Sequence, residues 1–300
     1  MSRLFLLSPI LLFCLSAKLP AQTNFWNSPD AYFGQTPPTD TPKIFAPKIL
    51  ADSGIVLGVV AFSKNGNEFY YTYARSWFDR KGSGVKQIIY DGKKWNEPKV
   101  LFEELSNPSL SIDENKLFFG GTGSTVWQSE RINNKWNSPV VVYKKSYGLY
   151  NFQPTNSGVF YAGSNANKGN KNDYSTYDFC TLTISKTDTA IQSLGKPLNT
   201  EGFDGDFYIA PESYIIISAK ETPTYESELY ISFRKADKTW TNPISLGPAI
   251  NDGLAHRFGQ YVTPDKKYLI YTKGTSEKDC NLYWVRFDEL LEKLKRENKS

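Results

Sequence analysis

The chain of 300 residues carries a net charge of +4, is 15% aromatic and contains one histidine and three cysteines. A charge this close to neutral, with no basic stripe, argues against a nucleic-acid partner. So few histidines and cysteines exclude a zinc site of the usual type, and no metal or cofactor site is predicted. Aromatic residues are abundant, and long windows of Ala, Leu and Glu are missing before the C-terminal end. This composition is typical of strands and predicts an all-β fold.

Residues 1–21 have the pattern of a cleaved secretory signal peptide. Arg3 supplies a short basic start, residues 4–17 form an apolar run too short to span a bilayer, and small residues follow. We expect cleavage after Ala21, with Ala17 as the alternative; cleavage after Ala21 removes two basic residues and lowers the net charge from +4 to +2. The chain is therefore expected to be exported, to the periplasm or out of the cell, without membrane insertion of the mature form.

One short phrase recurs five times along the chain. It has an apolar residue, a small residue or proline, a polar turn, and then a strand-like run of aromatic and branched residues. The copies are FSKNGNEFYYT (62–72), LSIDENKLFFG (110–120), QPTNSGVFYAG (153–163), IAPESYIIISA (209–219) and VTPDKKYLIYT (262–272). Their equivalent small residues lie 48, 44, 55 and 53 positions apart. Self-similarity at this period indicates a propeller or a solenoid.

Further strand signals complete each unit. Another strand-like run follows the phrase, and then come WNEP (95–98), WNSP (136–139) or WTNP (240–243), whose Trp is expected to fill the space between units. A unit with strands a, b, c and d joined by tight turns is one propeller blade. The count predicts a β-propeller with five blades of four antiparallel strands. A sixth, degenerate blade is the alternative, because two spacings exceed 50 residues.

The fifth unit lacks strand d, and the other end of the chain is expected to supply it. Residues 41–50 (TPKIFAPKIL) have the character of a strand, and a ring closed in this way leaves no sheet edge unpaired. We predict a lead-in at 22–40, the propeller at 41–287 and a helical tail at 288–300. The closing residues expected to be buried are Ile44, Phe45, Ile49 and Leu50. Deleting 41–50 should unfold the protein, whereas deleting 22–31 should not.

The two cysteines of the mature chain test this blade order. Cys180 and Cys280 lie in the third strands of the third and fifth units, which a whole blade separates in a closed ring. Because a disulfide needs Cα atoms within about 7 Å, we expect both thiols to be free.

The repeat phrases resemble those of the TolB-like, WD40-like β-propellers of bacterial cell envelopes. The most specific stretch is FDGDFYIAPESYIIIS with ELYISFRKADKTWTNPISLGPAIN, and similar phrases run from about residue 32 to the end of the chain. The first repeat departs from the usual Pro-Asp turn with Lys64-Asn65, and the third has a shortened turn. The resemblance implies a propeller fold and an exported location, and it implies no set of catalytic residues.

Candidate ligand-binding residues precede the first strands of the blades, where the chain leads toward the central channel. His256 and Arg257 come directly before the first strand of the fifth unit, and Tyr150 lies in the matching lead of the third. Asp204 and Asp206 are two positions apart, so on a strand they share a face. These five residues are the candidates for a ligand funnel. Each could instead serve the fold, by capping a turn or making one hydrogen bond.

Two functions fit these residues. The favoured one is a non-catalytic propeller that binds a protein or a glycan through its rim and funnel, as a monomer and without a cofactor. The alternative is a glycoside hydrolase or lactonase that uses Asp204, Asp206 and Glu201 at the channel mouth. A glycosidase needs two acids several ångströms apart with one of them protonated, whereas these acids cluster on one blade.

Overall fold

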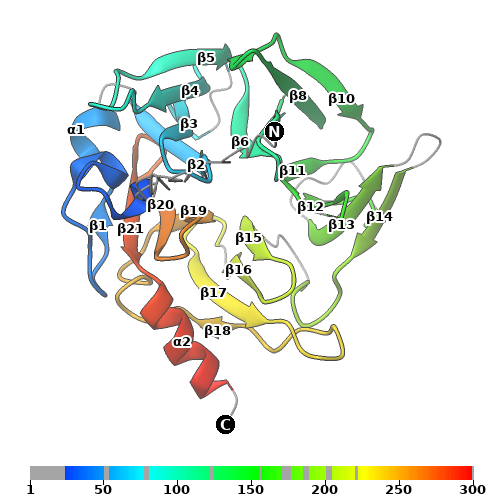
Figure 1. Ribbon diagram of the computed structural model, residues 1–300. Coiled ribbons are helices and arrows are strands. Elements are labelled where there is room, and N and C mark those ends of the chain that lie inside the picture. Colours follow the sequence, from blue (N-terminus) through cyan, green and yellow to red (C-terminus); the bar gives the residue numbers. More distant parts are fainter. Residues whose placement is uncertain are drawn as a thin grey trace, which may run out of the picture.

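Five antiparallel sheets surround a central channel in the computed structural model (Figure 1). The structure describes residues 24–50, 54–77, 81–121, 124–155, 157–169, 177–184, 189–200, 205–219 and 222–298. Each sheet is one blade, and the predicted five-bladed propeller is confirmed. The predicted signal peptide at 1–21 lies outside the described residues.

Within each blade the strands run from the channel to the rim. Blade 1 contains β2 (Ile55–Phe62), β3 (Glu68–Ala74), β4 (Gly84–Ile89) and β5 (Lys99–Glu103). Blade 2 contains β6 (Ser106–Leu110), β7 (Lys116–Gly120), β8 (Thr125–Ile132) and β10 (Val140–Lys144), with the short β9 (Lys135–Trp136) on β8. Blade 3 contains β11 (Leu149–Pro154), β12 (Val159–Ser164), β13 (Asp178–Ile184) and β14 (Thr189–Ser193). Blade 4 contains β15 (Phe207–Ala210), β16 (Tyr214–Ala219), β17 (Glu228–Phe233) and β18 (Ile244–Ser245). Blade 5 contains β19 (His256–Val262), β20 (Tyr268–Ser276), β21 (Asp279–Arg286) and, from the other end of the chain, β1 (Lys43–Ile44).

The repeated phrase forms the turn between the first two strands of a blade. In blades 1, 2 and 5 its hydroxyl accepts a hydrogen bond from the backbone N–H at or next to the start of the second strand. The same hydroxyl donates to the Asn or Asp two positions later. The pairs are Ser63 with Asn65 (2.7 Å), Ser111 with Asp113 (2.6 Å) and Thr263 with Asp265 (2.7 Å). These side chains hold the tight turn, which is why the chain repeats them.

Two of the three tryptophans near the fourth strands fill spaces between adjacent blades, as predicted, whereas Trp95 packs against the N-terminal segment. Trp136 of blade 2 donates its indole N–H to the Tyr70 hydroxyl of blade 1, 3.1 Å away. Trp240 of blade 4 is 4% exposed and packs with Phe179 of blade 3. These contacts bury large apolar surfaces between adjacent sheets.

The ring closes as predicted, by pairing of the two ends of the chain. Lys43 pairs with Trp284 and Ile44 with Tyr283, so β1 is the fourth strand of blade 5. Phe45 and Leu50 are buried, and Ile49 is half-buried. The prediction for Ile44 is wrong: it is 39% exposed, because β1 is the outermost strand. The strand is short because Pro47–Leu50 form the helix α1, and proline suits the first turn of a helix.

The lead-in before β1 is part of the core. It contains two 3-10 turns, η1 (Phe25–Asn27) and η2 (Ala31–Gly34), in which Trp26 and Tyr32 are buried. The Trp26 indole donates to the backbone oxygen of Lys64 in blade 1, 2.7 Å away. The Tyr32 hydroxyl donates to Asp265 of blade 5 at 2.5 Å. This segment therefore joins blades 1 and 5, and the expectation that 22–31 can be deleted without harm does not fit its packing.

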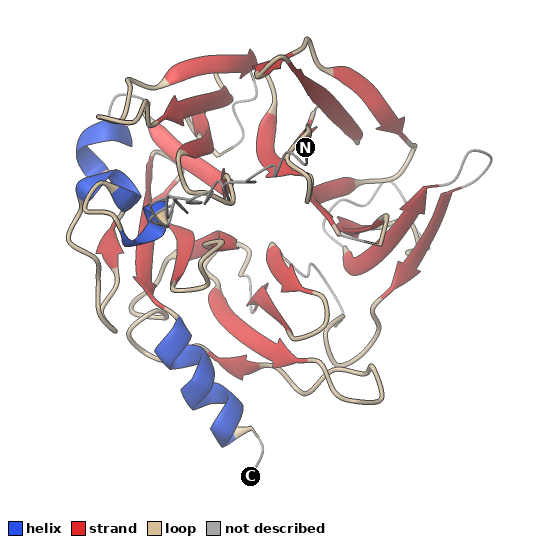
Figure 2. Cartoon of the chain, viewed as in Figure 1, coloured by secondary structure: helices blue, strands red, loops and turns tan. Residues whose placement is uncertain are grey.

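The helices lie beside this junction and beyond blade 5 (Figure 2). The C-terminal helix α2 (Asp288–Glu297) packs Leu291 and Leu294 against the core between blades 4 and 5. None of the helices in the described part of the chain has the length and apolar character needed to cross a membrane. Cys180 in β13 and Cys280 in β21 are both buried and are not joined by a disulfide, as predicted from the blade order.

Candidate functional site

Each blade has a residue with left-handed backbone at an equivalent position in or beside its inner strand. These residues are Gly58, Asn107, Asn151, Gly205 and Gly259, with φ between 52° and 63°. Glycine and asparagine adopt this conformation more readily than other residues. In β2, β6, β11 and β19 the pairing register shifts here, so these strands are bulged. We refer to the five residues as the bulge ring.

The bulge ring is tight where blades 5, 1 and 2 meet. A Cβ on Gly259 would lie 2.3 Å from the carbonyl carbon of Gly58. A Cβ on Gly58 would lie 2.6 Å from Oδ1 of Asn107. Both glycines are therefore required by close approach as well as by their positive φ.

Hydrogen bonds join the ring across blades 3, 4 and 5. The Asn151 amide donates to the backbone oxygen of Phe207 at 2.7 Å, and the Tyr150 hydroxyl donates to the backbone oxygen of Gly205. The backbone N–H of Gly259 donates to Oδ2 of Asp206 at 3.1 Å. Two of the predicted funnel residues, Tyr150 and Asp206, thus hold neighbouring blades together at the channel.

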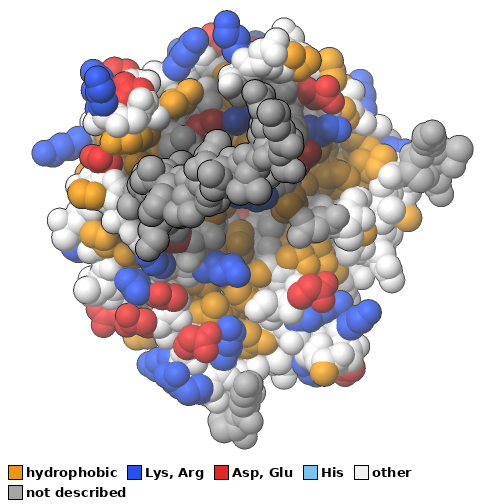
Figure 3. All heavy atoms as spheres, in the orientation of Figure 1, with side chains coloured by type: hydrophobic (Ala, Val, Ile, Leu, Met, Phe, Trp, Pro, Cys, Tyr) orange, Lys and Arg blue, Asp and Glu red, His pale blue; other side chains and the backbone are white. Residues whose placement is uncertain are grey.

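A cavity of about 170 Å³ lies next to the bulge ring, and all five blades contribute to its wall. Representative lining residues, one from each blade in order, are Val59, Pro108, Phe152, Tyr208 and Gln260. Most of the wall is apolar. In the space-filling view hydrophobic side chains are visible beside the channel, and charged side chains are visible both near it and at the rim (Figure 3).

Side chains of two inner strands bind the backbone of the next inner strand and so close the cavity wall. Gln153 donates to the oxygen of Ile209 (2.6 Å) and accepts from its N–H (3.1 Å). The Tyr261 hydroxyl accepts from the N–H of Phe62 at 3.0 Å. The unpaired edges of these inner strands are thus partly satisfied by side chains rather than by another strand.

Arg257 is a structural residue in this arrangement. It is 1% exposed, and its guanidinium donates to backbone oxygens of Ser227 and Ile250 at 2.9 Å each, and to others in the 252–255 loop. These bonds fasten the loop between blades 4 and 5. Its donors are therefore engaged away from the cavity, whose lining does not include Arg257.

His256 lies in an aromatic cluster made by three blades. Its ring centroid is 4.3 Å from Phe258 of blade 5, 5.0 Å from Trp77 of blade 1 and 5.7 Å from Tyr225 of blade 4. Burial lowers the pKa of His256 to about 4, so the imidazole is neutral near pH 7. The described structure thus does not bring His256, Arg257 and Asp206 together around one cavity. Asp204 and Glu201 lie outside the described residues.

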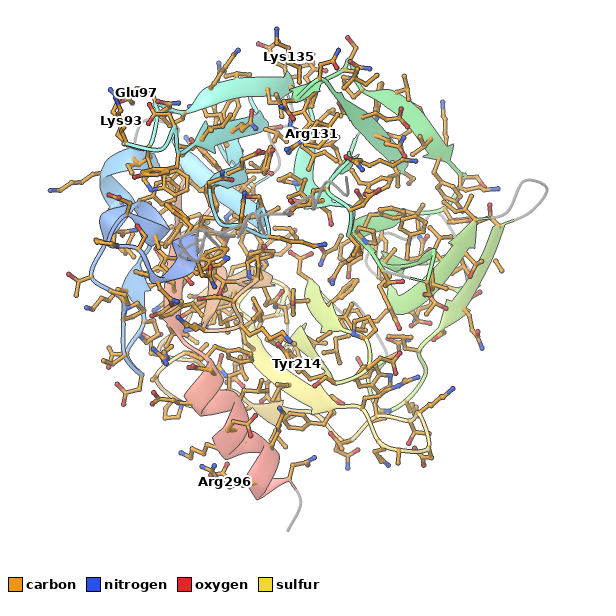
Figure 4. The ribbon with its side chains drawn as sticks, in the orientation of Figure 1. Lys93, Glu97, Arg131, Lys135, Tyr214 and Arg296 are labelled. Atoms are coloured by element: carbon orange, nitrogen blue, oxygen red, sulfur yellow. The ribbon has the colours of Figure 1, made fainter. Side chains whose placement is uncertain are left out.

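A further ionic group lies away from the cavity. Arg131, labelled in Figure 4, binds the Glu68 carboxylate through both terminal nitrogens at 2.9 and 2.7 Å. Burial and the charge of Glu68 raise the pKa of Tyr70, whose hydroxyl bonds to both side chains. This group links blade 2 to blade 1. Among the described residues no cluster of His, Cys, Asp and Glu could hold a metal ion.

Sequence reasoning missed Gln260 and the bulge ring. A signal was present: the leads SNPS (106–109), YNFQ (150–153), DGDF (204–207) and FGQY (258–261) all carry Gly or Asn at the same position. Aligning them would have predicted the ring and shown that Gln260 and Asp206 are equivalent.

No family model and no curated protein matches this chain. Several solved structures match it. A putative TolB from Agrobacterium tumefaciens is 8% identical with a TM-score of 0.47, over 83% of this chain and 78% of that one. TolB from Acinetobacter baumannii is 11% identical with a TM-score of 0.44, over 76% of this chain and 54% of that one. A chain from a study of two prolyl endopeptidases is 10% identical with a TM-score of 0.38, over 72% of this chain and 31% of that one. At these identities the likeness concerns the fold alone.

Proposed function

We propose that the protein is an exported, non-catalytic β-propeller that binds a protein or a glycan at its central channel. One observation carries the proposal: all five blades contribute to a single, largely apolar cavity at the channel. Concave apolar sites with a few polar groups are typical of binding sites. The N-terminal apolar run at 4–17 supports export, and an exported chain that begins at Gln22 would be the expected product. A mature protein that retains Met1 would contradict export.

The described candidate residues are engaged in contacts within the protein, which fits a non-catalytic propeller better than a hydrolase. Asp206 accepts a backbone N–H, Arg257 binds backbone oxygens, and His256 is held neutral among aromatic rings. A hydrolase of the glycosidase type would need one of its acids free and a second acid across the channel. The hydrolase alternative predicts turnover of a glycoside or lactone that is abolished by Asp204→Asn with Asp206→Asn, and such a result would overturn the proposal.

Site-specific crosslinking tests where a partner binds. Ile112 lines the cavity in the first turn of blade 2 and is 40% exposed. Ile184 ends β13 of blade 3 and is 38% exposed, which makes it a matched control away from the cavity. A photoreactive amino acid is placed at either position, and the protein is irradiated in extract of the source organism's cell envelope. We expect a discrete protein or glycan adduct from position 112 and none from 184. Equal adducts from both positions, or none from 112, would contradict binding at the channel.

A further inference from the structure

The outermost strand of blade 2 differs from the outermost strands of the other blades. In β10 three consecutive residues, Val140, Val141 and Val142, are 57%, 44% and 39% exposed. The equivalent strand of blade 1, β5, begins with Lys99 and ends with Glu103, and β14 of blade 3 carries Thr, Gln and Ser. The outermost strands of blades 4 and 5, β18 and β1, have two residues each. Because these strands are equivalent in the repeat, the long apolar edge belongs to blade 2 and is not required by the fold.

The backbone of β10 is open to pairing along one side. The strand pairs with β8 on its inner side and ends the sheet on the other (Figure 1). An edge strand presents a row of N–H and C=O groups with which another strand can pair. Tyr143 of the same strand is 5% exposed and belongs to the core cluster between blades 2 and 3. The edge is therefore held in place, and little further ordering is needed when a partner binds to it.

The chain around β10 is basic. Residues 131–172 contain six Lys and Arg residues and no Asp or Glu. Lys135 precedes β10, Lys144 ends it and Lys145 follows, and all three are exposed. Figure 4 shows Lys135 at the rim, pointing away from the channel. Within the described parts of the chain none of these lysines forms an ion pair, and Glu130 of the neighbouring β8 is paired with a lysine of β7 at 3.7 Å. Positive charge thus lies on both sides of the three valines.

Two occupants of this edge fit the observations poorly. A second copy of the chain, paired edge to edge, would bring the lysines of both copies into one interface, and lysines on edge strands are a common guard against such pairing. An anionic membrane would attract the lysines, but lipid chains cannot form hydrogen bonds with the N–H and C=O groups of the edge. An extended acidic segment of another protein supplies both the opposite charge and the backbone partners.

We propose that the outer edge of β10 is a docking site for an extended segment of a partner protein, apolar in its middle and acidic at its ends, which adds to blade 2 as a further strand. The backbone of the segment pairs with the open edge, its apolar side chains lie beside the valines, and its acids face Lys135, Lys144 and Lys145. The inference goes beyond the proposed function, because β10 contributes no residue to the lining of the channel cavity. A partner at the channel neither supports nor excludes it.

The probe is a blocked, fluorescently labelled peptide in which alternating Val and Thr are flanked by Glu at both ends. One control peptide has Lys in place of Glu, and the other keeps the Glu residues and carries N-methyl groups on its central amides, which removes their hydrogen-bond donors. Fluorescence anisotropy measures the dissociation constants for the wild type, for Lys144→Glu with Lys145→Glu, and for Lys93→Glu with Lys94→Glu. The last protein is the matched control, because it reverses two exposed charges between β4 and β5 of blade 1.

We expect the acidic peptide to bind the wild type about tenfold more tightly than either control peptide. Lys144→Glu with Lys145→Glu should weaken the acidic peptide about tenfold, whereas Lys93→Glu with Lys94→Glu should leave its affinity unchanged. Amide hydrogen exchange within 140–144 should slow when the peptide is bound, because N–H groups that pair with a new strand are protected.

Equal affinity for the three peptides, no binding of any, equal weakening in the two double variants, or no change of exchange within 140–144 would overturn the proposal. Sedimentation of the wild type with anionic phosphatidylglycerol vesicles, without binding of the acidic peptide, would assign the edge to a membrane instead. A dimer in which 140–144 is protected without any peptide would assign it to a second copy. If Lys144→Glu with Lys145→Glu does not fold, the three peptides on the wild type and the exchange within 140–144 still decide.

Discussion

The junction between blades 5 and 1 is built differently from the junction between blades 2 and 3. Between blades 2 and 3, Phe118 and Phe152 pack directly against each other, and the chain passes straight from one blade to the next. Between blades 5 and 1, a third element is inserted, because Trp26, Tyr32 and Phe45 of the N-terminal segment pack among residues of both blades. The two kinds of junction thus bury aromatic residues in different ways.

The difference follows from how far apart the joined parts are in the sequence. Tyr32 and Asp265, which are hydrogen-bonded, are separated by 233 positions. Bringing together residues so far apart in the sequence costs conformational entropy, which the contacts at the junction must offset. The N-terminal segment supplies these contacts. We therefore expect the closing junction to be the place where the ring is most sensitive to change.

The largest effect is expected from deleting 41–50. The deletion removes β1, which pairs with β21, and the buried side chains of Phe45 and Leu50. Each buried apolar side chain of this size contributes about 1.5–3 kcal/mol, and blade 5 would also lose its outer strand. We expect the cooperative thermal transition to be lost. Circular dichroism measures the transition, and size-exclusion chromatography detects unfolded or aggregated protein. Lys48→Ala, an exposed change in the same segment, should melt like the parent. A deletion protein that also melts like the parent would show that the ring closes in another way.

A smaller effect is expected from Trp26→Ala. Trp26 is 6% exposed and donates to Lys64, so its truncation should lower the free energy of unfolding by about 3–5 kcal/mol. Phe160→Ala, at the junction of blades 2 and 3, should lower it by only about 1–2 kcal/mol, because Phe160 is half-buried. Denaturant unfolding of both variants measures the two losses. Equal decreases in the free energy of unfolding for the two variants would contradict the expectation that the closing junction is the more sensitive one.

Local chemistry explains which parts of this architecture could be predicted from the sequence. Ser63 with Asn65, and its equivalents, act within one turn, so their pattern is visible at fixed spacing and gives the number of blades. The pairing of β1 could be predicted because one blade was a strand short. The exposure of Ile44 could not, since it depends on how little of the outermost strand of blade 5 is covered by other parts of the chain.

The candidate site was harder to predict because it depends on long-range packing. Arg257 has the sequence context of a channel residue, but most of its partners are backbone oxygens, which a pattern of side chains does not reveal. Trp26 was assigned to a dispensable lead-in because its partner, Lys64, lies in blade 1. Gln260 becomes distinctive only when its equivalents around the ring are known to be Val59, Pro108, Phe152 and Asp206.

The last prediction concerns the pH dependence of the closing junction at the His256 cluster, where Trp77 of blade 1 meets blade 5. Burial lowers the pKa of His256 from its ordinary value of 6.5 to about 4. The unfolded chain therefore binds the proton more readily than the folded protein. The contribution of the neutral imidazole to the free energy of unfolding is fully present above about pH 6.5 and is lost as the pH falls toward 4, by about 3 kcal/mol in total.

Carboxylates also titrate in part of this range, so the difference between the wild type and His256→Phe isolates the histidine. Denaturant unfolding from pH 7 to pH 4 should show a steeper loss of stability in the wild type than in His256→Phe. The phenyl ring keeps the contacts with Trp77 and Phe258 and cannot be protonated. Parallel pH profiles would show that the imidazole is already accessible to protons in the folded ring, and the aromatic cluster would then add nothing specific to the closure.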